Sequence, residues 1–431
     1  MNAMTRKLFA ASLLALAAQA AHADLDITVT GSNVAPKPIA VVPFSGAADA
    51  PTDVAAVVAA DLDRSGLFKT MARSDMLEKP DEPSQVDYRN WRAVGMDDVV
   101  IGQMRRDGNG YTTRFYLLDV YRGEQLLGFD IPSAPPNQLR YVAHQIADLI
   151  YEKLTGVRGY FNTQIAYITV TGGIGPSRRW QLIVADSDGE SPRVIATSKE
   201  PLMSPAWSPD RTRLAYVGYE HGHSAIYLHT LATGELRRFV FEKGINGAPA
   251  WSPDGSKLAV TLSFETNPDI YVVDVATGAR RRLTENSAID TEPSWSPDGQ
   301  SIVFTSDRGG SAQIYKMSAS GGSPTRLTFQ GKQNLRAEYA PDGRSLVLVN
   351  NDGSGYRIGL FDLQTGNLRL ISNGPLDESP SFAPNGAVVI YTATGRHGSE
   401  LETVTVDGRV RQTLRQVGSE VREPAWSPYI R

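Results

Sequence analysis

The sequence predicts an α/β N-terminal domain at residues 24–158, followed by an all-β six-bladed β-propeller at residues 159–431 that is closed by the C-terminal strand. Three observations support this prediction: an aromatic motif recurs at a nearly constant spacing, each repeat contains four strand patterns, and the last motif copy has no strands after it. The chain of 431 residues is long enough for two or three domains.

The motif Pro-Ala-Trp-Ser-Pro-Asp begins at Pro205 and recurs in modified form to the end of the chain. Its aromatic positions are residues 207, 251, 295, 339, 382 and 426, at spacings of 44, 44, 44, 43 and 44. After Trp251, three strand patterns follow at residues 257–263, 269–275 and 280–284. Four strands in such a period are typical of a propeller blade. We expect each ring to wedge between neighbouring blades, and the prolines to lie on strands that face the channel.

The count of strands predicts how the ring closes. The sixth motif copy, at Trp426, lies five residues from the C-terminus. Three strand patterns at residues 164–170, 180–186 and 193–197 precede the first copy and have no inner strand of their own. Residues 424–427 are therefore expected to complete the first blade.

Residues 24–158 carry no trace of the repeat and read as a small α/β domain. Strands are predicted at residues 39–44, 99–104, 112–121 and 124–131. One helix is expected at residues 52–65 with Thr52 as its N-cap, and an amphipathic one at residues 137–154, ended by Gly156.

The first 23 residues have the pattern of a secretory signal. Arg6 and Lys7 precede an apolar stretch, and an Ala-x-Ala site predicts cleavage between Ala23 and Asp24. The apolar stretch of about 11 residues is too short to span a bilayer. Because the chain has no cysteine, it has neither a lipid attachment site nor a disulfide. These features predict an exported protein that does not insert into the membrane.

Charge argues against nucleic-acid binding. The chain has 43 basic and 47 acidic residues and no basic block, and its formal net charge is -4. We expect a monomer without a cofactor.

The segment that would begin the mature chain alternates strictly, with Leu25, Ile27 and Val29 on one face and Asp24, Asp26 and Thr28 on the other. It can pair as a strand. Two interpretations remain open: an edge strand of its own domain, or a detachable strand that adds to a partner.

The connectors that enter the inner strands form one rim of the predicted channel. Each carries an apolar residue before the aromatic position: Leu202, Ile245, Ile289, Leu335, Leu376 and Val421. Charged residues surround them: Glu200, Lys243, Asp290, Glu292, Arg336, Asp377, Glu378, Arg422 and Glu423. An apolar centre with a charged border favours protein recognition. Alternatively, the apolar residues cap the blades, or the carboxylates hold a cation at the channel mouth.

A hydrolase and a ligand sensor are the alternatives to a binding scaffold. A serine peptidase would need a Gly-x-Ser-x-Gly elbow, which is absent. His221, His223 and His229 could imitate a zinc site, although a solvated turn explains them better. A metal-dependent propeller hydrolase remains an alternative through the rim carboxylates. A periplasmic sensor of cell-wall fragments or sugars would need exposed aromatic residues repeated at the rim, and the sequence shows no such repeat.

Several segments resemble the TolB family of the Tol-Pal system of Gram-negative envelopes. They include the alternating segment after Asp24, residues 39–44 and 152–156, residues 201–210, Asn246 to Pro249, Thr291 to Pro293, and the ending at residues 424–429. This resemblance implies a non-enzymatic periplasmic scaffold that binds the lipoprotein Pal through the propeller and TolA through its N-terminal segment. It also implies roles in outer-membrane integrity and in constriction at division, and use by colicins.

The resemblance and the rim together give the candidate site residues. The expected Pal face comprises Met203, Ile245, Asn246, Ala248, Thr291, Glu292, Arg336, Asp377, Glu378, Arg422 and Glu423. The expected TolA segment comprises Asp24, Leu25, Asp26, Ile27, Thr28, Val29 and Val34. Ile245 replaces a histidine of the family pattern, and the N-terminal segment has a different charge order.

Overall fold

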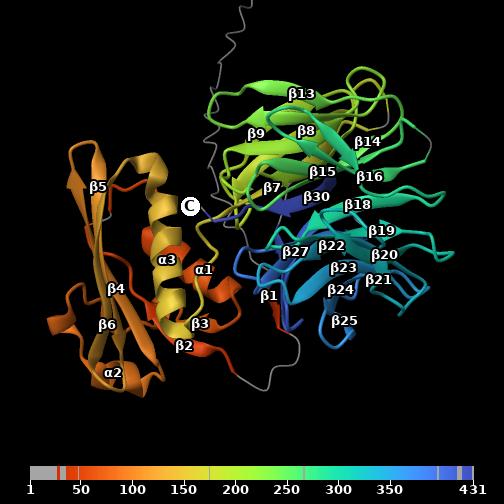
Figure 1. The fold of residues 1–431 in the computed structure, drawn as a ribbon. Helices are drawn as coiled ribbons and strands as arrows, with labels where there is room; N and C mark the ends of the chain where they lie inside the picture. Colours follow the sequence, from red (N-terminus) through yellow and green to blue (C-terminus); the bar gives the residue numbers. More distant parts are fainter. Residues whose placement is uncertain are drawn as a thin grey trace, which may run out of the picture.

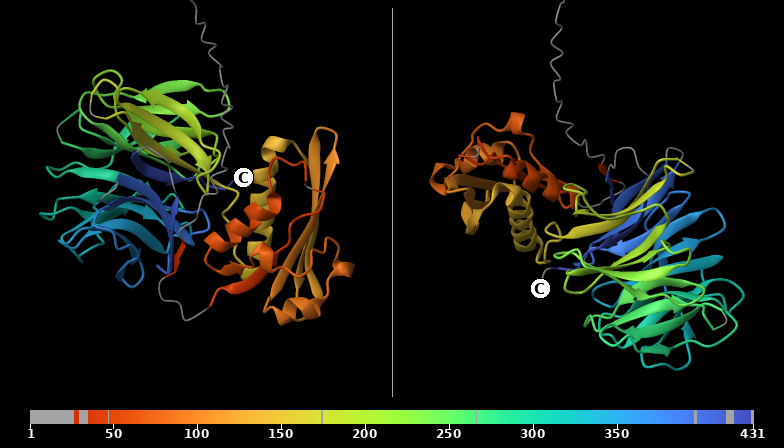
Figure 2. Two further views of the ribbon diagram at one scale, coloured as in Figure 1. Left: turned by 180° about the vertical axis from the view of Figure 1, so that it is seen from behind. Right: turned by 90° about the horizontal axis from the view of Figure 1, so that it is seen from above.

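The computed structural model describes residues 27–29, 35–46, 48–173, 175–265, 267–395, 398–414 and 420–429. They form an α/β domain that lies beside a ring of β-sheets (Figures 1 and 2). The predicted leader and its cleavage site at Ala23 and Asp24 lie outside the described residues. Within the described part of the chain, no helix is both long enough and apolar enough to cross a membrane.

The N-terminal domain is built on a five-stranded sheet of order β3-β2-β4-β5-β6. Strand β2 is parallel to β3 and β4, and the remaining pairs are antiparallel. Helices α1 and α3 lie between this sheet and the propeller (Figure 1). The elements are β2 (Lys37–Val41), α1 (Val54–Arg64), β3 (Phe68–Thr70), η1 (Arg73–Asp75), η2 (Pro83–Gln85), α2 (Tyr88–Ala93), β4 (Asp98–Asp107), β5 (Gly110–Asp119), β6 (Glu124–Ala134), η3 (Pro136–Gln138) and α3 (Leu139–Thr155).

The ends of the two long helices follow capping chemistry. The N-cap of α1 is Asp53, so the prediction of Thr52 was wrong by one residue. The Asp53 carboxylate accepts the Ala56 N–H at 3.0 Å and also forms an ion pair with Arg73. The neutral hydroxyl of Thr52 could not form this ion pair. Helix α3 ends at Thr155 and is capped by Gly156, whose φ of 74° is the left-handed conformation that favours glycine.

The ring contains six blades of four strands, which confirms the predicted propeller. Blade 1 comprises β30 (Glu420–Trp426), β7 (Gln164–Thr171), β8 (Arg179–Asp186) and β9 (Arg193–Ser198). Blade 2 comprises β10 (Leu202–Trp207), β11 (Arg213–Gly218), β12 (Ala225–Thr230) and β13 (Leu236–Val240). Blade 3 comprises β14 (Asn246–Trp251), β15 (Lys257–Leu262), β16 (Asp269–Asp274) and β17 (Arg280–Arg282). Blade 4 comprises β18 (Asp290–Trp295), β19 (Ser301–Ser306), β20 (Gln313–Ser318) and β21 (Thr325–Arg326). Blade 5 comprises β22 (Gln333–Tyr339), β23 (Ser345–Asn351), β24 (Tyr356–Asp362) and β25 (Leu368–Leu370). Blade 6 comprises β26 (Asp377–Phe382), β27 (Val388–Gly395), β28 (Gly398–Thr405) and β29 (Val410–Leu414).

The C-terminal strand closes the ring as predicted. Strand β30 is the inner strand of blade 1 and pairs antiparallel with β7, with Trp426 opposite Ile165. Beyond the strand, the Ser427 N–H donates to the Gln164 carbonyl at 2.8 Å, and the Gln164 N–H donates to the Ser427 hydroxyl at 2.9 Å. The first and last parts of the propeller are therefore held in one sheet.

The repeated aromatic residues join neighbouring blades. The indole N–H of Trp251 donates to the Ala206 carbonyl of blade 2 at 3.2 Å, and that of Trp295 donates to the Ala250 carbonyl of blade 3 at 3.1 Å. Trp207 makes the same bond to the Ala425 carbonyl of blade 1 at 3.0 Å. The predicted wedge is thus accompanied by a polar contact that fixes its orientation.

Replacing Trp251 tests this wedge. Trp251 is buried, so Trp251→Ala is expected to lower the free energy of unfolding by about 3–5 kcal/mol through loss of packing and of the indole hydrogen bond. Trp251→Phe keeps a ring between the blades and is expected to cost less. Urea denaturation of both variants measures the difference; a loss below about 1 kcal/mol for the alanine variant would contradict a packing role.

One hydrophobic core runs through both parts of the molecule. It combines residues of α1 and α3 with Tyr160 and Phe161 of the connecting segment and with Trp426 of blade 1. The ring of Tyr160 lies edge-on to Trp426 at 5.7 Å between centroids, and Tyr151 of α3 lies edge-on to Phe161 at 5.6 Å. The aromatic contacts continue from the helices into the ring, so the connecting segment is part of the core.

Candidate functional site

The six inner strands surround a central channel with a volume of about 890 Å³. Its lining includes Met203 and Ile245 at the end where the inner strands begin, and Arg158 and Tyr429 at the other end. The Tyr429 hydroxyl donates to the Gly159 carbonyl at 2.9 Å, which places the second end beside the segment that leads to the N-terminal domain. The first end, here called the mouth, is the rim that the sequence predicted as a binding face.

Every inner strand has the same irregularity near the mouth. Strand pairing shifts register there, as between Met203 and Ala206 in β10, which indicates a β-bulge. One residue of each bulge has a positive φ, between 46° and 57°: Ser204, Ala248, Glu292, Arg336, Ser379 and Glu423. Eight non-glycine residues in the described part of the chain have positive φ, and these six hold one position of the repeat. Such strained conformations concentrate at functional sites.

The bulge residues form a charged network across the channel. The Glu423 carboxylate accepts the Ser204 N–H at 2.8 Å and the Arg336 guanidinium at 3.0 Å. The Glu292 carboxylate accepts the Arg336 N–H at 2.9 Å and the Thr305 hydroxyl at 2.9 Å. Arg336 therefore lies against two carboxylates. Its guanidinium supplies positive charge at the place where a bound cation is the alternative prediction.

The structure separates the predicted Pal-face residues by exposure. Met203, Ile245, Glu378 and Arg422 are exposed at the mouth, with Ile245 at 48%. Five others are half-buried on the inner strands: Ala248, Thr291, Glu292, Arg336 and Glu423. Asn246 and Asp377 are buried, at 0% and 1% exposure. Nine of the eleven predicted residues are therefore accessible at least in part.

Asn246 and Asp377 shape the connectors of the mouth. The Asn246 side-chain amide donates to the Ser224 carbonyl at 2.9 Å and accepts the Glu242 N–H at 2.8 Å. The Asp377 carboxylate accepts the Ser372 hydroxyl at 2.5 Å and the Gly374 N–H at 2.9 Å. Both side chains use their polar groups inside the loop, so their effect on a partner would be indirect.

The channel also holds a carboxylate that the sequence analysis did not select. Glu338 accepts the Phe382 N–H at 2.8 Å, and burial raises the pKa of this carboxyl to about 7. It occupies the repeat position held by Ala206, Ala250 and Ala425, so comparison of the repeats could have identified it.

The predicted TolA segment is paired with the last blade. Strand β1 (Ile27–Val29) lies antiparallel to β29, with Val29 opposite Val410, and extends blade 6 to five strands. Asp24, Leu25, Asp26 and Val34 lie outside the described residues. The segment therefore adds to the propeller sheet and not to the sheet of the N-terminal domain.

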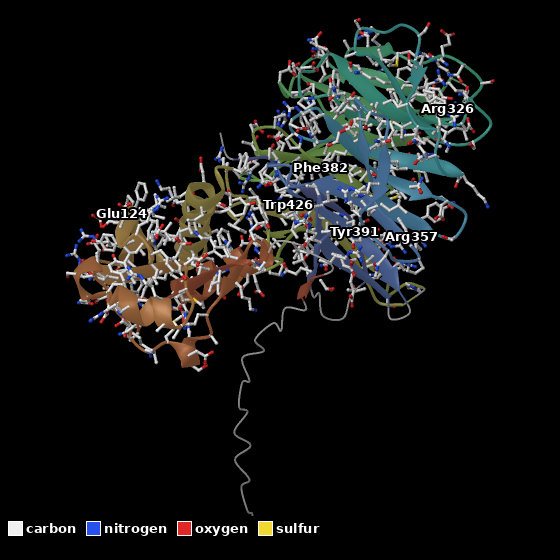
Figure 3. All side chains as sticks on the ribbon, turned by 90° about the horizontal axis from the view of Figure 1, so that it is seen from below. Glu124, Arg326, Arg357, Phe382, Tyr391 and Trp426 are labelled. Carbon is white, nitrogen blue, oxygen red and sulfur yellow. The ribbon has the colours of Figure 1, made fainter. Side chains whose placement is uncertain are left out.

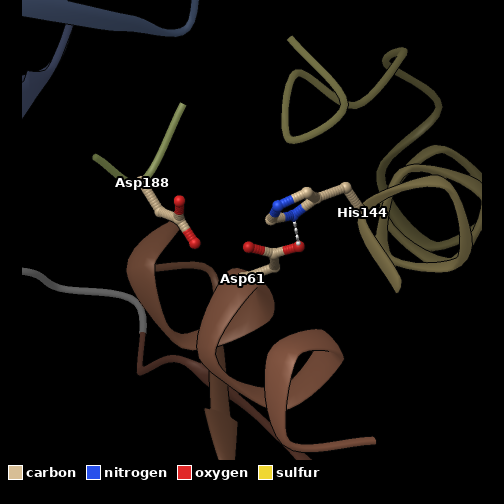
Figure 4. A group of neighbouring side chains, drawn as sticks. All are labelled: Asp61, His144 and Asp188. Carbon is tan, nitrogen blue, oxygen red and sulfur yellow. Dashed lines mark hydrogen bonds and ion pairs between the residues drawn. The ribbon is translucent and has the colours of Figure 1, made fainter. Parts of the chain in front are cut away.

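A buried group of charges lies where α1 and α3 meet blade 1. Ligand atoms of Asp61, His144 and Asp188 lie within 4.8 Å of one another (Figure 4). His144 Nδ1 is 2.7 Å from the Asp61 carboxylate, and its Nε2 is 3.9 Å from Asp186. This spacing would suit a metal ion, but arginines already bind the carboxylates.

Two arginines supply the positive charge of this interdomain cluster. The Arg64 guanidinium is 2.9 Å from Asp61 and donates to the Ser187 hydroxyl of the propeller at 2.8 Å. Arg140 contacts Asp186 at 3.3 Å and Asp188 at 2.5 Å. Despite burial, these cations and His144 lower the pKa of Asp188 to about 2. The arrangement is an ion-pair network, and a metal ion would be repelled by both guanidinium groups.

The pH dependence of stability tests the charge of His144. Burial alone would lower the pKa of His144, but the Asp61 carboxylate outweighs burial and raises it. The stabilisation is therefore complete below the unfolded-state pKa of about 6.5 and is lost as pH rises through the folded-state pKa. Urea denaturation from about pH 6 to pH 9 should show a fall in the free energy of unfolding of about 1.4 kcal/mol per unit of pKa shift.

His144→Gln is expected to remove this slope. Asp148 serves as a control, because burial raises the pKa of its carboxyl to about 6, so its contribution is lost as pH rises from about 4 to about 6, below the range in which His144 acts. Asp148→Asn should therefore leave the slope above about pH 7 unchanged. Parallel stability profiles for wild type and His144→Gln would contradict a charged imidazole.

Comparison with known proteins identifies the family. A family model described as the TolB beta propeller domain matches residues 151–430, and one described as the TolB amino-terminal domain matches residues 25–126. The chain belongs to the TolB family. TolB is a non-enzymatic component of the Tol-Pal system.

TolB proteins of other bacteria match nearly the whole chain. The Tol-Pal system protein TolB of Methylococcus capsulatus is 60% identical over 416 residues, covering 96% of this chain and 97% of that protein. TolB of Xanthomonas campestris pv. campestris is 51% identical, with coverage of 97% and 96%. The crystal structure of TolB from Acinetobacter baumannii is 38% identical, covers 94% of this chain and 100% of that chain, and superimposes with a TM-score of 0.86.

Proposed function

We propose that the protein is a periplasmic scaffold that binds the lipoprotein Pal at the channel mouth and TolA through residues 24–34. In this role it would serve outer-membrane integrity and constriction during division, and colicins could use the same mouth. Membership of the TolB family supports Tol-Pal partners in general. The assignment of each partner to a surface rests on the features of the mouth and of β1.

The set of bulges is the observation that supports the mouth as the Pal site. Each bulge places a residue at the channel whose type the blade does not dictate, since serine, alanine, glutamate and arginine all occur there. Glu292, Arg336 and Glu423 hold fixed charges in the centre, while Met203 and Ile245 are exposed around them. A preorganised polar centre with an apolar border suits recognition of a folded protein.

The pairing of β1 with β29 supports a detachable N-terminal segment. Ile27–Val29 forms three residue pairs on the outer edge of blade 6, where main-chain hydrogen bonds supply the contact. A partner sheet or groove could offer equivalent bonds. TolA would then compete with blade 6 for the same strand, and a ligand that stabilises the docked form would weaken TolA binding.

A pull-down with purified Pal and TolA tests both assignments. Glu292→Ala is expected to lose Pal while keeping TolA, because the variant removes a mouth carboxylate distant from β1. The backbone tolerates alanine at this position, since Ala248 holds the equivalent place with a φ of 46°. A chain that starts at Pro36 should show the reverse pattern.

The matched control is Glu124→Ala, which removes an exposed carboxylate from the N-terminal domain, far from the propeller (Figure 3). This variant should retain both partners. If Glu292→Ala and the shortened chain both bind Pal and TolA as wild type does, the proposed sites are wrong.

A further inference from the structure

The mouth continues outward into an apolar surface that shares only Ile245 with the predicted Pal face. Four large side chains on the connectors of blades 2 to 5 are exposed: Phe241 at 54%, Ile245 at 48%, Ile289 at 49% and Phe329 at 68%. Phe241 follows β13 directly and Ile245 precedes β14 directly, so a single connector links the outer edge of the ring to the mouth. These four residues are here called the apolar arc.

The repeats provide an internal control for the two phenylalanines. Phe241 and Phe329 lie 88 residues apart, which is two periods, at one position of the connector. The equivalent residues of three other blades are Thr197, Glu285 and Asn373, all exposed. Since those blades form with a polar residue there, blade folding does not require phenylalanine. The two exposed rings are therefore a feature of this side of the ring, and they favour a function located there.

Each of the two rings is held in place by an arginine. The Arg238 guanidinium lies 4.6 Å from the centroid of Phe241, and that of Arg326 lies 4.7 Å from the centroid of Phe329. Arg326 is fixed in turn by a bond to the Thr328 carbonyl at 2.7 Å. Arg326 lies on the side of the propeller that points away from the N-terminal domain (Figure 3). A stacked ring has already lost much of its side-chain freedom in the free protein. Less conformational entropy is therefore lost when a partner covers the ring.

The charges around the apolar arc indicate what kind of surface it fits. Lys243 and Lys332 are exposed on the same connectors. Glu242 is paired with Arg280, whereas Arg282 is shared by Glu265, Asp269 and, at 3.8 Å, the exposed Glu285. The two phenylalanine rings therefore lie next to cations, because Arg238 and Arg326 stack on them and the two lysines follow on the same connectors. A complementary partner would carry apolar side chains bordered by carboxylates.

We propose that the same partner that occupies the mouth, Pal in the proposed function, also covers the apolar arc with an apolar, acid-bordered element. This inference rests on the proposed function, because the arc is continuous with the mouth through Ile245. Phe241 and Phe329 act as aromatic anchors at the outer edge, and the charges of the bulge residues set the register at the centre. The contact thus covers one side of the ring, from blade 2 to blade 5.

The first test measures binding of the purified periplasmic part of Pal to the mature full-length chain. Phe241→Ser with Phe329→Ser is expected to weaken binding at least about tenfold, since truncation of buried aromatic anchors commonly has this effect. Binding of wild type should itself weaken at higher salt, because salt screens the attraction between Lys243 and Lys332 and the carboxylates of the partner. Tyr121→Ser, at an exposed ring of 61% on the N-terminal domain, is the control and should bind as wild type does.

The second test does not remove an anchor. Because the chain has no cysteine, Gln330→Cys places a single thiol beside Phe329 in the exposed part of the connector. Its alkylation rate should fall severalfold when the Pal complex forms, whereas that of Tyr121→Cys should not change. An unchanged rate at residue 330 within a formed complex would overturn the inference.

The two proposals fail in different ways. If Glu292→Ala loses Pal while the double phenylalanine variant keeps full affinity, the mouth is the Pal site and the apolar arc is not part of it. If sedimentation shows that the phenylalanines instead drive self-association of the chain, the inference is overturned in favour of a second copy. If wild type forms no complex with Pal at all, the proposed function fails first.

Discussion

Removal of residues 420–431 is expected to lower the melting temperature sharply and to broaden the unfolding transition. The deletion takes away β30, so β7 loses its inner neighbour and the Trp207 indole loses the Ala425 carbonyl. Both edges at the break would expose unpaired main-chain groups and apolar surface. Circular dichroism during heating measures the effect, and dye binding reports the exposed apolar surface.

A shorter deletion provides the control for ring closure. Removing only residues 430–431 leaves β30 and its pairing with β7 intact and should not change the melting temperature. A melting temperature that stays within a few degrees of wild type after removal of residues 420–431 would contradict closure by the C-terminal strand.

Arg64→Ala is expected to lower the free energy of unfolding by about 3–5 kcal/mol, since removing one partner of a buried pair leaves the other charge uncompensated. Arg64 is 6% exposed, and its loss would take one of two cationic partners from the buried Asp61 carboxylate and one of two hydrogen bonds from the Ser187 hydroxyl at the domain contact. The guanidinium also lies 5.1 Å from the centroid of Phe161, so packing would be lost as well. Urea denaturation followed by tryptophan fluorescence measures the change.

An exposed ion pair between an arginine and an aspartate provides the control for this variant. Arg106→Ala removes a partner of Asp49 at the surface of the N-terminal domain and should cost less than about 1 kcal/mol. Equal effects of the two substitutions would show that the interdomain cluster contributes no more than a surface ion pair.

The architecture was predictable because its determinants are local and repeated. The aromatic residues recur every 43 or 44 positions, and Ser-Pro-Asp-Gly turns and strand patterns lie between them, so the six blades and their closure follow from counting. Gly156 ended α3 as predicted, because a left-handed helix end favours glycine. The small error at α1 arose because Thr52 and Asp53 are adjacent and both can cap a helix.

The details of the site depend on contacts that no local pattern encodes. Positive φ at Ala248, Glu292 and Arg336 has no signature in the residue type, so the bulges could not be predicted. Asn246 resembles an exposed polar residue in sequence, but its amide is used inside the connector. Arg64 and Ser187 are 123 residues apart, and only the docking of the two domains brings them together.

The bulge positions also determine how the recognition properties of such a protein can change by substitution. The blades fold with four different residue types at the six channel positions, because the backbone conformation there is fixed by the sheet and not by the side chain. Substitutions at these positions would alter what the ring recognises while leaving its folding largely unaffected. In related bacteria, single replacements at these positions could therefore change the preference for a partner without altering the fold of the propeller.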